Sequence, residues 1–258
     1  ENLIKENINF IKNYSLEPIT FIEETSETIT ISKNTIIKDD FIINPNQELI
    51  IEPGVKLILD NAYLKIFGRF EARGTDKKPI IIQGKGELGT LYFNSQKDII
   101  IDNVMFKNLT NKKSSFAQPA SITFYESDFI DISNSIFSNN LSGDDYLNFF
   151  RSQNVSIKNS QFFDILNDAI DSDFSSISIL DSQFNNIGND AVDGSGSSIN
   201  IINSEFISIK DKAISSGENS KFSVINSLFK NNEIGIVSKD GSSLYASRLK
   251  LIGNKLDF

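Results

Sequence analysis

Residues 177–184 read ISILDSQF, and 22 residues later residues 199–206 read INIINSEF. Both stretches follow the pattern apolar-x-apolar-x-Asn/Asp-Ser-x-Phe, which recurs with small variations through most of the chain. The closing phenylalanines are Phe106, Phe137, Phe162, Phe184, Phe206 and Phe229, at intervals of 31, 25, 22, 22 and 23. Intervals of this size indicate a repeat architecture, in which each unit buries its apolar residues against its neighbours.

A second set of positions repeats every 22 residues. Its members are small residues, namely Ala169, Ala191, Ala213 and Gly235. Each is followed by an aliphatic residue, and we expect that residue to point inward. Because side chains alternate along a strand, Asp171 and Asp193 are then predicted to point outward. The small residues are predicted to form the floor of an open groove.

The runs between these marks are short, rich in β-branched residues and separated by turn residues such as Pro53-Gly54. Coils of about 22 residues with three short strands each predict an all-β fold, a right-handed parallel β-helix. A leucine-rich repeat has a similar period, but its recurrent leucine pattern is missing here. Residues 2–14 have helical spacing. We therefore expect an N-terminal helical cap over residues 1–27 and the β-helix over residues 28–258.

Two residue types support stacked coils. The chain has 21 Phe and no Trp, which is expected if one inward position is filled by a stack of similar rings. The Asn of each repeat, replaced by Asp181 in one coil, is interpreted as a structural turn residue that forms a ladder. The long first interval contains residues 108–119, which we interpret as an inserted loop.

Composition limits the chemistry. The chain has neither Cys nor His, which excludes thiolate nucleophiles, disulfides, Ser-His-Asp catalysis and imidazole metal sites. A net charge of −9 argues against nucleic acid as a partner. No apolar stretch is long enough to span a membrane, and no export signal is visible. Acid-base groups must be Asp, Glu, Lys, Arg or Tyr, and a bound metal must accept oxygen ligands, as Ca²⁺ does. No organic cofactor is indicated.

Besides Asp181, five aspartates fall within residues 168–193 on consecutive coils, namely Asp168, Asp171, Asp173, Asp190 and Asp193. Stacked at one strand spacing, Asp171 and Asp193 are expected about 5 Å apart. Carboxylates that close repel each other unless a proton, a metal or a cation lies between them. The two residues are therefore candidates for the catalytic pair of a glycoside hydrolase, and a separation of about 5 Å suits retention of configuration.

Two other interpretations remain open at this stage. The aspartates can instead bond backbone amides at turns, as short acidic side chains often do. The same face can also be a non-catalytic glycan- or calcium-binding module of a larger exported protein. Only Tyr146, Phe149 and Phe150 are obvious rings for stacking on a sugar. Asp144 and Asp145 are interpreted as loop acids.

The central blocks also carry a resemblance. Residues 168–174 read DAIDSDF and residues 190–197 read DAVDGSGS, and related blocks stand at 145–151, 211–220 and 238–240. They resemble a family of bacterial right-handed β-helix repeat proteins, which departs from this chain at Tyr146, where it has Ala. More widely, the chain is similar to the pectin-lyase-like superfamily.

That resemblance implies polysaccharide binding along one face of the solenoid, and in several members calcium-assisted β-elimination with an Arg or Lys base. It implies calcium ligands at Asp171, Asp173, Asp193 and Glu218. It implies cationic catalytic groups at Arg151, Lys212 and Lys239. Further substrate-binding positions are expected at Asn148, Asp168, Asp190, Ser195 and Ser215. The expected location is extracellular, on the cell surface or periplasmic, with a fused or partner surface protein as a further expectation.

Overall fold

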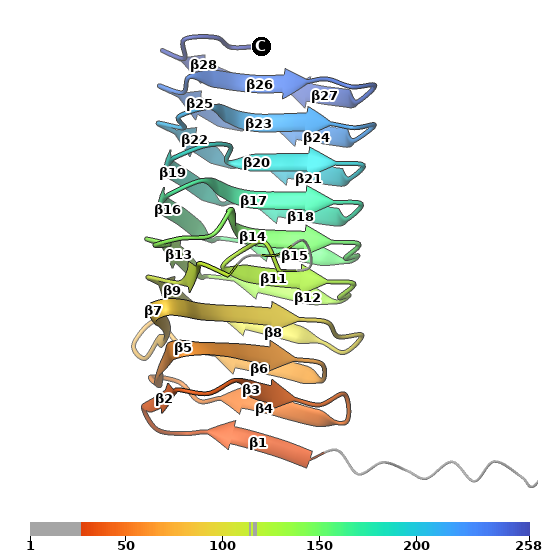
Figure 1. Cartoon of the computed structure of the whole chain (residues 1–258). Coiled ribbons are helices and arrows are strands. Elements are labelled where there is room, and N and C mark those ends of the chain that lie inside the picture. The colour runs from red at the N-terminus through yellow and green to blue at the C-terminus, as the bar shows by residue number, and fades with distance from the viewer. Residues whose placement is uncertain (1–26, 114, 116–117) are drawn as a thin grey trace, which may run out of the picture.

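The structure is a computed structural model that describes residues 27–113, 115 and 118–258. Within those residues the chain forms 28 strands and no helix. The strands wind into a parallel β-solenoid whose coils stack in one column (Figure 1). The predicted helix at residues 2–14 lies outside the described residues. In the part of the chain that the structure describes, no helix is long and apolar enough to cross a membrane.

Each full coil contributes a strand to three faces of the solenoid. Face 1 is a ten-stranded sheet. Its strands are β1 (Glu27–Ile31), β4 (Gln47–Ile51), β6 (Arg69–Arg73), β8 (Ile99–Asp102), β12 (Ile130–Ser133), β15 (Val155–Lys158), β18 (Ser176–Leu180), β21 (Ser198–Ile202), β24 (Lys221–Ile225) and β27 (Ser243–Ser247).

Faces 2 and 3 belong to one 18-stranded sheet, because two long strands run through the corner between them. Those strands are β5 (Lys56–Ile66) and β7 (Ile80–Phe93). Face 2 also contains β2 (Thr35–Ile37), β9 (Val104–Lys107), β13 (Ile136–Ser138), β16 (Gln161–Ile165), β19 (Gln183–Ile187), β22 (Glu205–Ile207), β25 (Leu228–Lys230) and β28 (Lys250–Ile252). Face 3 also contains β3 (Phe41–Ile43), β11 (Ile122–Tyr125), β14 (Asp145–Phe150), β17 (Asp168–Asp173), β20 (Val192–Ser195), β23 (Lys212–Gly217) and β26 (Ile234–Ser238).

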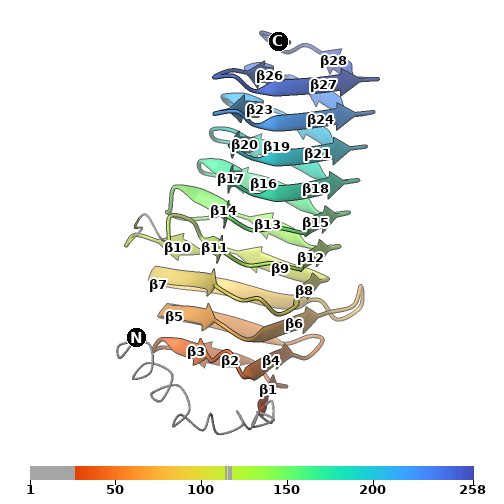
Figure 2. The same cartoon turned by 90° about the vertical axis from the view of Figure 1, so that its right-hand side faces the viewer.

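The coils remain in register where the intervals between repeats differ. Ile122 of β11 pairs in parallel with Leu91 of β7 on one side and with Leu147 of β14 on the other. The extra residues of this coil leave the stack at β10 (Thr110–Asn111), which pairs antiparallel with β7. Figure 2 shows β10 at the side of the column, next to β11 and β14. The predicted insertion is therefore accommodated outside the coil.

The repeated phenylalanines form a stack inside face 2. Consecutive ring centroids are 4.7–5.1 Å apart, and the ring planes are within 9° of parallel. All six rings are fully buried. Rings at this spacing match the distance between neighbouring strands, so each coil continues the core of the previous one. The predicted stack is confirmed.

The repeated Asn residues have the structural role expected of them. Asn103, Asn134, Asn159, Asp181, Asn203 and Asn226 all have a positive φ between 46° and 54°. Asn tolerates this left-handed conformation better than most residues, and it occurs where the chain turns from face 1 to face 2. Asn159 also donates from Nδ2 to Oδ1 of Asn134 at 2.6 Å. The amides therefore form a ladder along the corner.

Buried serines form a second ladder, at the corner after face 3. The hydroxyl of each serine accepts the backbone N–H of the serine one coil earlier, as from Ser175 to Ser197 at 3.0 Å and from Ser197 to Ser220 at 3.0 Å. Backbone donors at a buried corner need such partners, because water cannot reach them.

The expectation that the small residues form an open groove floor is wrong. Ala169, Ala191 and Ala213 are fully buried and belong to the hydrophobic core. Strand β17 buries Ala169 and Ile170 in succession, so alternation is locally broken there. One coil earlier the same position holds Tyr146, whose hydroxyl is 3.2 Å from the carbonyl oxygen of Ser138 inside the core. These positions therefore face the core and not an open surface.

Candidate functional site

Face 3 places the predicted acidic residues in columns, one residue per coil. Asn148 pairs with Asp171, Asp171 with Asp193, and Asp193 with Ser215. A second column two residues further along contains Tyr125, Phe150, Asp173 and Ser195. Asp171, Asp173 and Asp193 are all partly exposed. Ile170 and Val192, which directly precede Asp171 and Asp193, are buried. The predicted outward direction of Asp171 and Asp193 is therefore observed.

A pocket of about 390 Å³ opens where these columns meet the segment between β10 and β11. Its lining residues are Ser115, Pro119, Asp144, Asp145, Asn148, Phe150, Asp171 and Asp173. Four of the eight are acidic, and none is basic. Pro119 and Phe150 give the pocket two apolar wall elements, which suits a ligand with both apolar and polar surfaces.

Burial and mutual repulsion shift the pKa values of these acids upward. The pKa of Asp171 rises to about 8, first because of burial and then because of the charges of Asp173 and Asp193. The pKa of Asp145 is raised well above its usual range by burial and by Asp171. Burial also raises the pKa of Asp173. Of the three, Asp171 is therefore expected to keep its proton at neutral pH.

Asn148 opposes these shifts. It donates from Nδ2 to Oδ2 of Asp171 at 2.8 Å. Its side chain also hydrogen bonds to Asp173, and it lowers the pKa of both carboxyls. The amide therefore lines the pocket and bonds to both carboxyl groups of β17.

Asp168 and Asp190 mainly bond backbone amides. Oδ1 of Asp168 accepts the backbone N–H of Asp190 at 2.8 Å and the amide of Asn189 at 2.6 Å. Oδ1 of Asp190 accepts the backbone N–H of Lys212 at 2.9 Å. The pKa of Asp168 still rises to about 7 because burial outweighs these bonds. The alternative interpretation, in which the acids cap backbone, thus describes these two residues.

The three predicted catalytic cations lie outside the pocket. Nζ of Lys212 is 3.3 Å from Asp190 and 2.5 Å from Asp211. Burial lowers the pKa of Lys212. The hydrogen bonds and charges of these two acids raise it by more, so the net shift of the pKa is upward. Arg151 is exposed, 3.5 Å from Glu126 and 5.2 Å above the ring of Phe150. Lys239 lies against Gly217, where an added Cβ would be 3.2 Å from its Cε.

The four predicted calcium ligands do not form one cluster. Glu218 accepts a hydrogen bond from the hydroxyl of Ser195 at 2.5 Å, and Asp193 accepts the backbone N–H of Gly194 at 2.9 Å. Among the described residues, no group of three or more acids is arranged to hold a metal ion. Calcium binding at these residues stays a prediction.

The aromatic residues are arranged differently from the expectation. Tyr146 and Phe149 are fully buried and cannot contact a sugar. Phe150 points outward at the pocket, and its ring stacks on Tyr125 at 4.9 Å. Tyr92 continues the series at 6.5 Å from Tyr125, and Phe174 packs edge-on against Phe150 at 6.1 Å.

We call Tyr92, Tyr125, Phe150 and Phe174 the aromatic ladder. Its members come from successive coils and are partly or largely exposed. Sequence reasoning missed Tyr92 and Tyr125, although alternation gives the direction of Tyr125: in the stretch ITFY, Ile122 and Phe124 point inward and Tyr125 outward.

Asp145 was also missed. It is the first residue of β14 rather than part of a loop, it pairs in register with Asp168, and only 5 % of its surface is exposed. The usable signal was its position 23 residues before Asp168, close to the 22-residue period.

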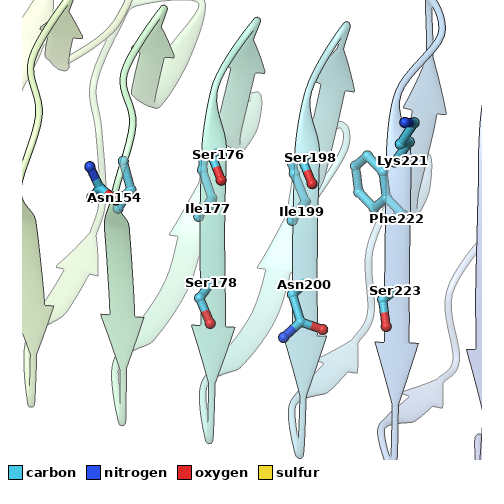
Figure 3. A pocket seen from close by; sticks show the side chains of 11 residues that line it. Asn154, Ser176, Ile177, Ser178, Ser198, Ile199, Asn200, Lys221, Phe222 and Ser223 are labelled. Atoms are coloured by element: carbon cyan, nitrogen blue, oxygen red, sulfur yellow. The ribbon is translucent and has the colours of Figure 1, made fainter.

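A second depression, of about 400 Å³, lies on face 1 (Figure 3). Ser178, Asn200 and Ser223 occupy equivalent positions on neighbouring strands there, with Lys221 at one side. Its described lining contains no carboxylate, so it lacks the acid-base groups that the pocket on face 3 carries.

No family model and no curated protein matches the chain. Solved structures similar to it include pectate lyase Pel9A, with 12 % identity over 84 % of this chain and 71 % of that chain and a TM-score of 0.45. The surface protein and adhesin PfbA of Streptococcus pneumoniae has 11 % identity over 91 % and 90 %, with a TM-score of 0.43. An alginate lyase from Paenibacillus sp. has 12 % identity over 90 % and 99 %, with a TM-score of 0.34. The parallel β-helix that the sequence predicts is seen directly in the strand pairing.

Proposed function

We propose that the chain binds a polysaccharide along face 3 and hydrolyses it at the pocket, with Asp171 as the proton donor. The observation that carries this proposal is the position of the pocket. Its paired carboxyl groups line the same pocket as a partly exposed ring, Phe150, which belongs to the aromatic ladder. Sugar rings stack on such rings through their apolar faces, and glycosidic bonds are cleaved between two carboxyl groups.

The raised pKa of Asp171, about 8, supports its role as the acid. A carboxyl group that keeps its proton at neutral pH can protonate the leaving oxygen of a glycosidic bond. The second group must be ionised to activate water or to attack the sugar directly. Once Asp171 holds the proton, a neighbouring carboxyl group ionises more readily, because repulsion between the two is relieved.

Two neighbours can act as that second group, and they predict different products. Asp173 is two residues along the same strand, about 6.5 Å away by strand geometry, which suits inversion of configuration. Asp193 is one coil away, about 5 Å, which suits retention. We favour Asp173, because it lines the pocket with Asp171 and both hydrogen bond to Asn148.

A lyase mechanism has less support. Lys212 is held by Asp190 and Asp211, and Arg151 contacts Glu126. None of the predicted basic residues lines the pocket, so no cation there can abstract a proton or neutralise a uronate. The predicted calcium ligands have the oxygen donors that Ca²⁺ prefers, but they do not converge. The proposal therefore gives calcium no step.

The test is release of reducing ends from a panel of neutral, acidic and amino-sugar polysaccharides. Asp171→Asn is expected to lower an observed rate by about 10²–10⁴-fold, the usual contribution of a general acid. Asp131→Asn, which removes an exposed carboxylate on face 1, is the matched control and should leave the rate unchanged. Proton NMR of the first product then distinguishes Asp173 from Asp193 by the anomer released.

The alternative is a binding module without catalysis. The aromatic ladder supports a binding module, because a sugar can stack on its rings without any acidic group. Binding of a glycan without any cleavage, weakened by loss of Phe150 but not by Asp171→Asn, would establish this alternative. In either case the ligand is a polysaccharide, and a protein meets most polysaccharides outside the cytoplasm. We therefore propose an exported or cell-surface location. Protease treatment of intact cells can test it.

A further inference from the structure

The pocket on face 3 has the charge of a cation site. We propose that it accepts the ammonium group of an amino sugar, with Asp145 as the counter-ion. This inference rests on the proposed function, because it names the class of glycan that face 3 binds.

Asp145 carries the argument. Its side chain is 95 % buried, since only 5 % of its surface is exposed, and it lines the pocket. Among the described residues, its carboxyl group makes no side-chain hydrogen bond and no salt bridge. The charged groups that act on it are Asp144, Asp168, Asp171 and Asp173, all acidic. A buried acid without a partner is costly, and a cationic ligand would remove that cost.

No described residue of the pocket lining supplies a cation. The eight described lining residues include neither Lys nor Arg. Two of the basic residues predicted for the site are paired elsewhere, Arg151 with Glu126 and Lys212 with Asp190 and Asp211. The positive charge must therefore come from the ligand. The same pocket would repel a polyuronate, whose carboxylates would lie beside four acids.

An ammonium fits better than a metal ion. Calcium needs about six to eight oxygen ligands at about 2.3–2.6 Å, and no three acids among the described residues converge on one point. An ammonium needs only one or two acceptors, and Asp145 offers both of its oxygens. A pocket of about 390 Å³ is also far larger than an ion. Phe150 and Pro119 give it the apolar walls against which a sugar ring packs.

The experiment compares two tetrasaccharides of the same linkage, one of glucosamine and one of N-acetylglucosamine. Isothermal titration calorimetry measures both against the wild-type chain, Asp145→Asn and Asp131→Asn. The wild-type chain is expected to bind the amino tetrasaccharide at least about tenfold more tightly. Asp145→Asn should abolish that preference and leave binding of the acetylated sugar unchanged. Asp131→Asn removes the same charge from an exposed residue of face 1, outside the pocket, and should change the preference less than about threefold.

A second readout follows from charge balance. Burial and the neighbouring acids raise the pKa of Asp145 well above its usual range, so pairing with an ammonium should favour loss of its proton. Titrations in buffers of different ionisation enthalpy should therefore show more proton release with the wild-type chain than with Asp145→Asn. The variant keeps the shape of the native residue but cannot ionise. Its melting temperature checks the fold, and Asp145→Ser, which is smaller and also lacks the carboxyl group, replaces it if it does not fold.

The outcomes separate the two proposals. Equal affinity for the two sugars, or a preference that survives in Asp145→Asn, overturns the amino-sugar inference and leaves glycan binding standing. Absence of binding to either sugar and to the wider glycan panel overturns both. Tight binding of Ca²⁺ alone that depends on Asp145 would assign the pocket to a metal and would also overturn the inference.

Discussion

Asn148 of β14 donates a hydrogen bond from Nδ2 to Oδ2 of Asp171 on β17, one coil away, at 2.8 Å. This bond stabilises the ionised form of Asp171, whereas burial and the charges of Asp173 and Asp193 favour the protonated form. The balance of these effects raises the pKa of Asp171 to about 8. Asn148 therefore controls the pH at which the proposed acid loses its proton.

Replacement of Asn148 by Ala should raise the pKa of Asp171 further. A general acid works in its protonated form, so activity falls as the pH rises through its pKa. We expect the alkaline limb of the pH–rate profile to move upward by about half to one unit, the scale of one hydrogen bond. Asn200→Ala on face 1 is the control. An alkaline limb that stays in place, or moves to lower pH, would show that Asn148 does not act on the acid.

The stability of the fold should decrease between acidic and alkaline pH. The pKa values of Asp168 and Asp171, about 7 and about 8, exceed those of an unfolded Asp, so the folded state binds more protons between these values. Their stabilising contribution is complete below about pH 4 and is lost as the pH rises through about 7 and 8. Urea unfolding at pH 5 and pH 8.5 should differ by about 1–3 kcal/mol.

Asp171→Asn should reduce this difference, because the variant cannot ionise at that position. Asp131→Asn should preserve it. A free energy of unfolding that is constant or increases over this range would contradict the assigned burial of the acids.

The phenylalanine stack should dominate stability. Phe184 lies between Phe162 and Phe206, at 4.7 and 4.9 Å. Phe184→Ala should lower the free energy of unfolding by about 3–5 kcal/mol, through lost burial and the cavity that remains. Phe174→Ala, at a ring that is 54 % exposed, should cost less than about 1 kcal/mol. Similar losses in both variants would show that the two rings are equally buried.

Gly188 should not tolerate even a methyl group. A Cβ there would lie 1.9 Å from the backbone oxygen of Leu166 on the previous coil. Gly188→Ala should therefore destabilise the fold by about 1–3 kcal/mol or more, because backbone must move. Gly217→Ala is the matched control, since its Cβ would lie 3.2 Å from the flexible side chain of Lys239 and at an ordinary contact distance of 3.7 Å from the backbone oxygen of Gly194. Equal melting temperatures of the two variants would contradict the close approach at Gly188.

The aromatic ladder should determine glycan affinity. Tyr125→Ala removes the ring that stacks on Phe150 at 4.9 Å. We expect binding of an accepted oligosaccharide to weaken about three- to tenfold, as for the loss of one stacking contact. Tyr245 on face 1, 60 % exposed, is the control position, and Tyr245→Ala should not alter affinity. Calorimetric titration measures both, and equal effects would place the binding face elsewhere.

The fold could be predicted because the sequence indicates both the length of each coil and which side chains point inward. The phenylalanine spacing gives the coil length, and alternation gives the direction of Asp171 and Asp193. Each of these inferences needs only the contacts that one coil makes with the next. The same reasoning failed at Ala169, because strand β17 buries two residues in succession and alternation is lost there.

The site could be predicted only in part. The column of Asp171 and Asp193 follows from the period, but the pocket also depends on where the segment between β10 and β11 lies, and Ser115 and Pro119 belong to that segment. This segment lies outside the repeat pattern, so the repeats do not predict its path. Asp145 was misassigned for a related reason, because it follows a region where the interval departs from 22 residues.

The insertion at β10 also bears on how such a site can change during evolution. Ile122 pairs with Leu91 and Leu147 as if no residues had been added, so the length of the preceding segment is decoupled from the column. One wall of the pocket can therefore be lengthened, shortened or replaced while the carboxyl groups of β14 and β17 stay where they are. Selection for a new glycan can act on that wall without endangering the folding of the coils beneath it.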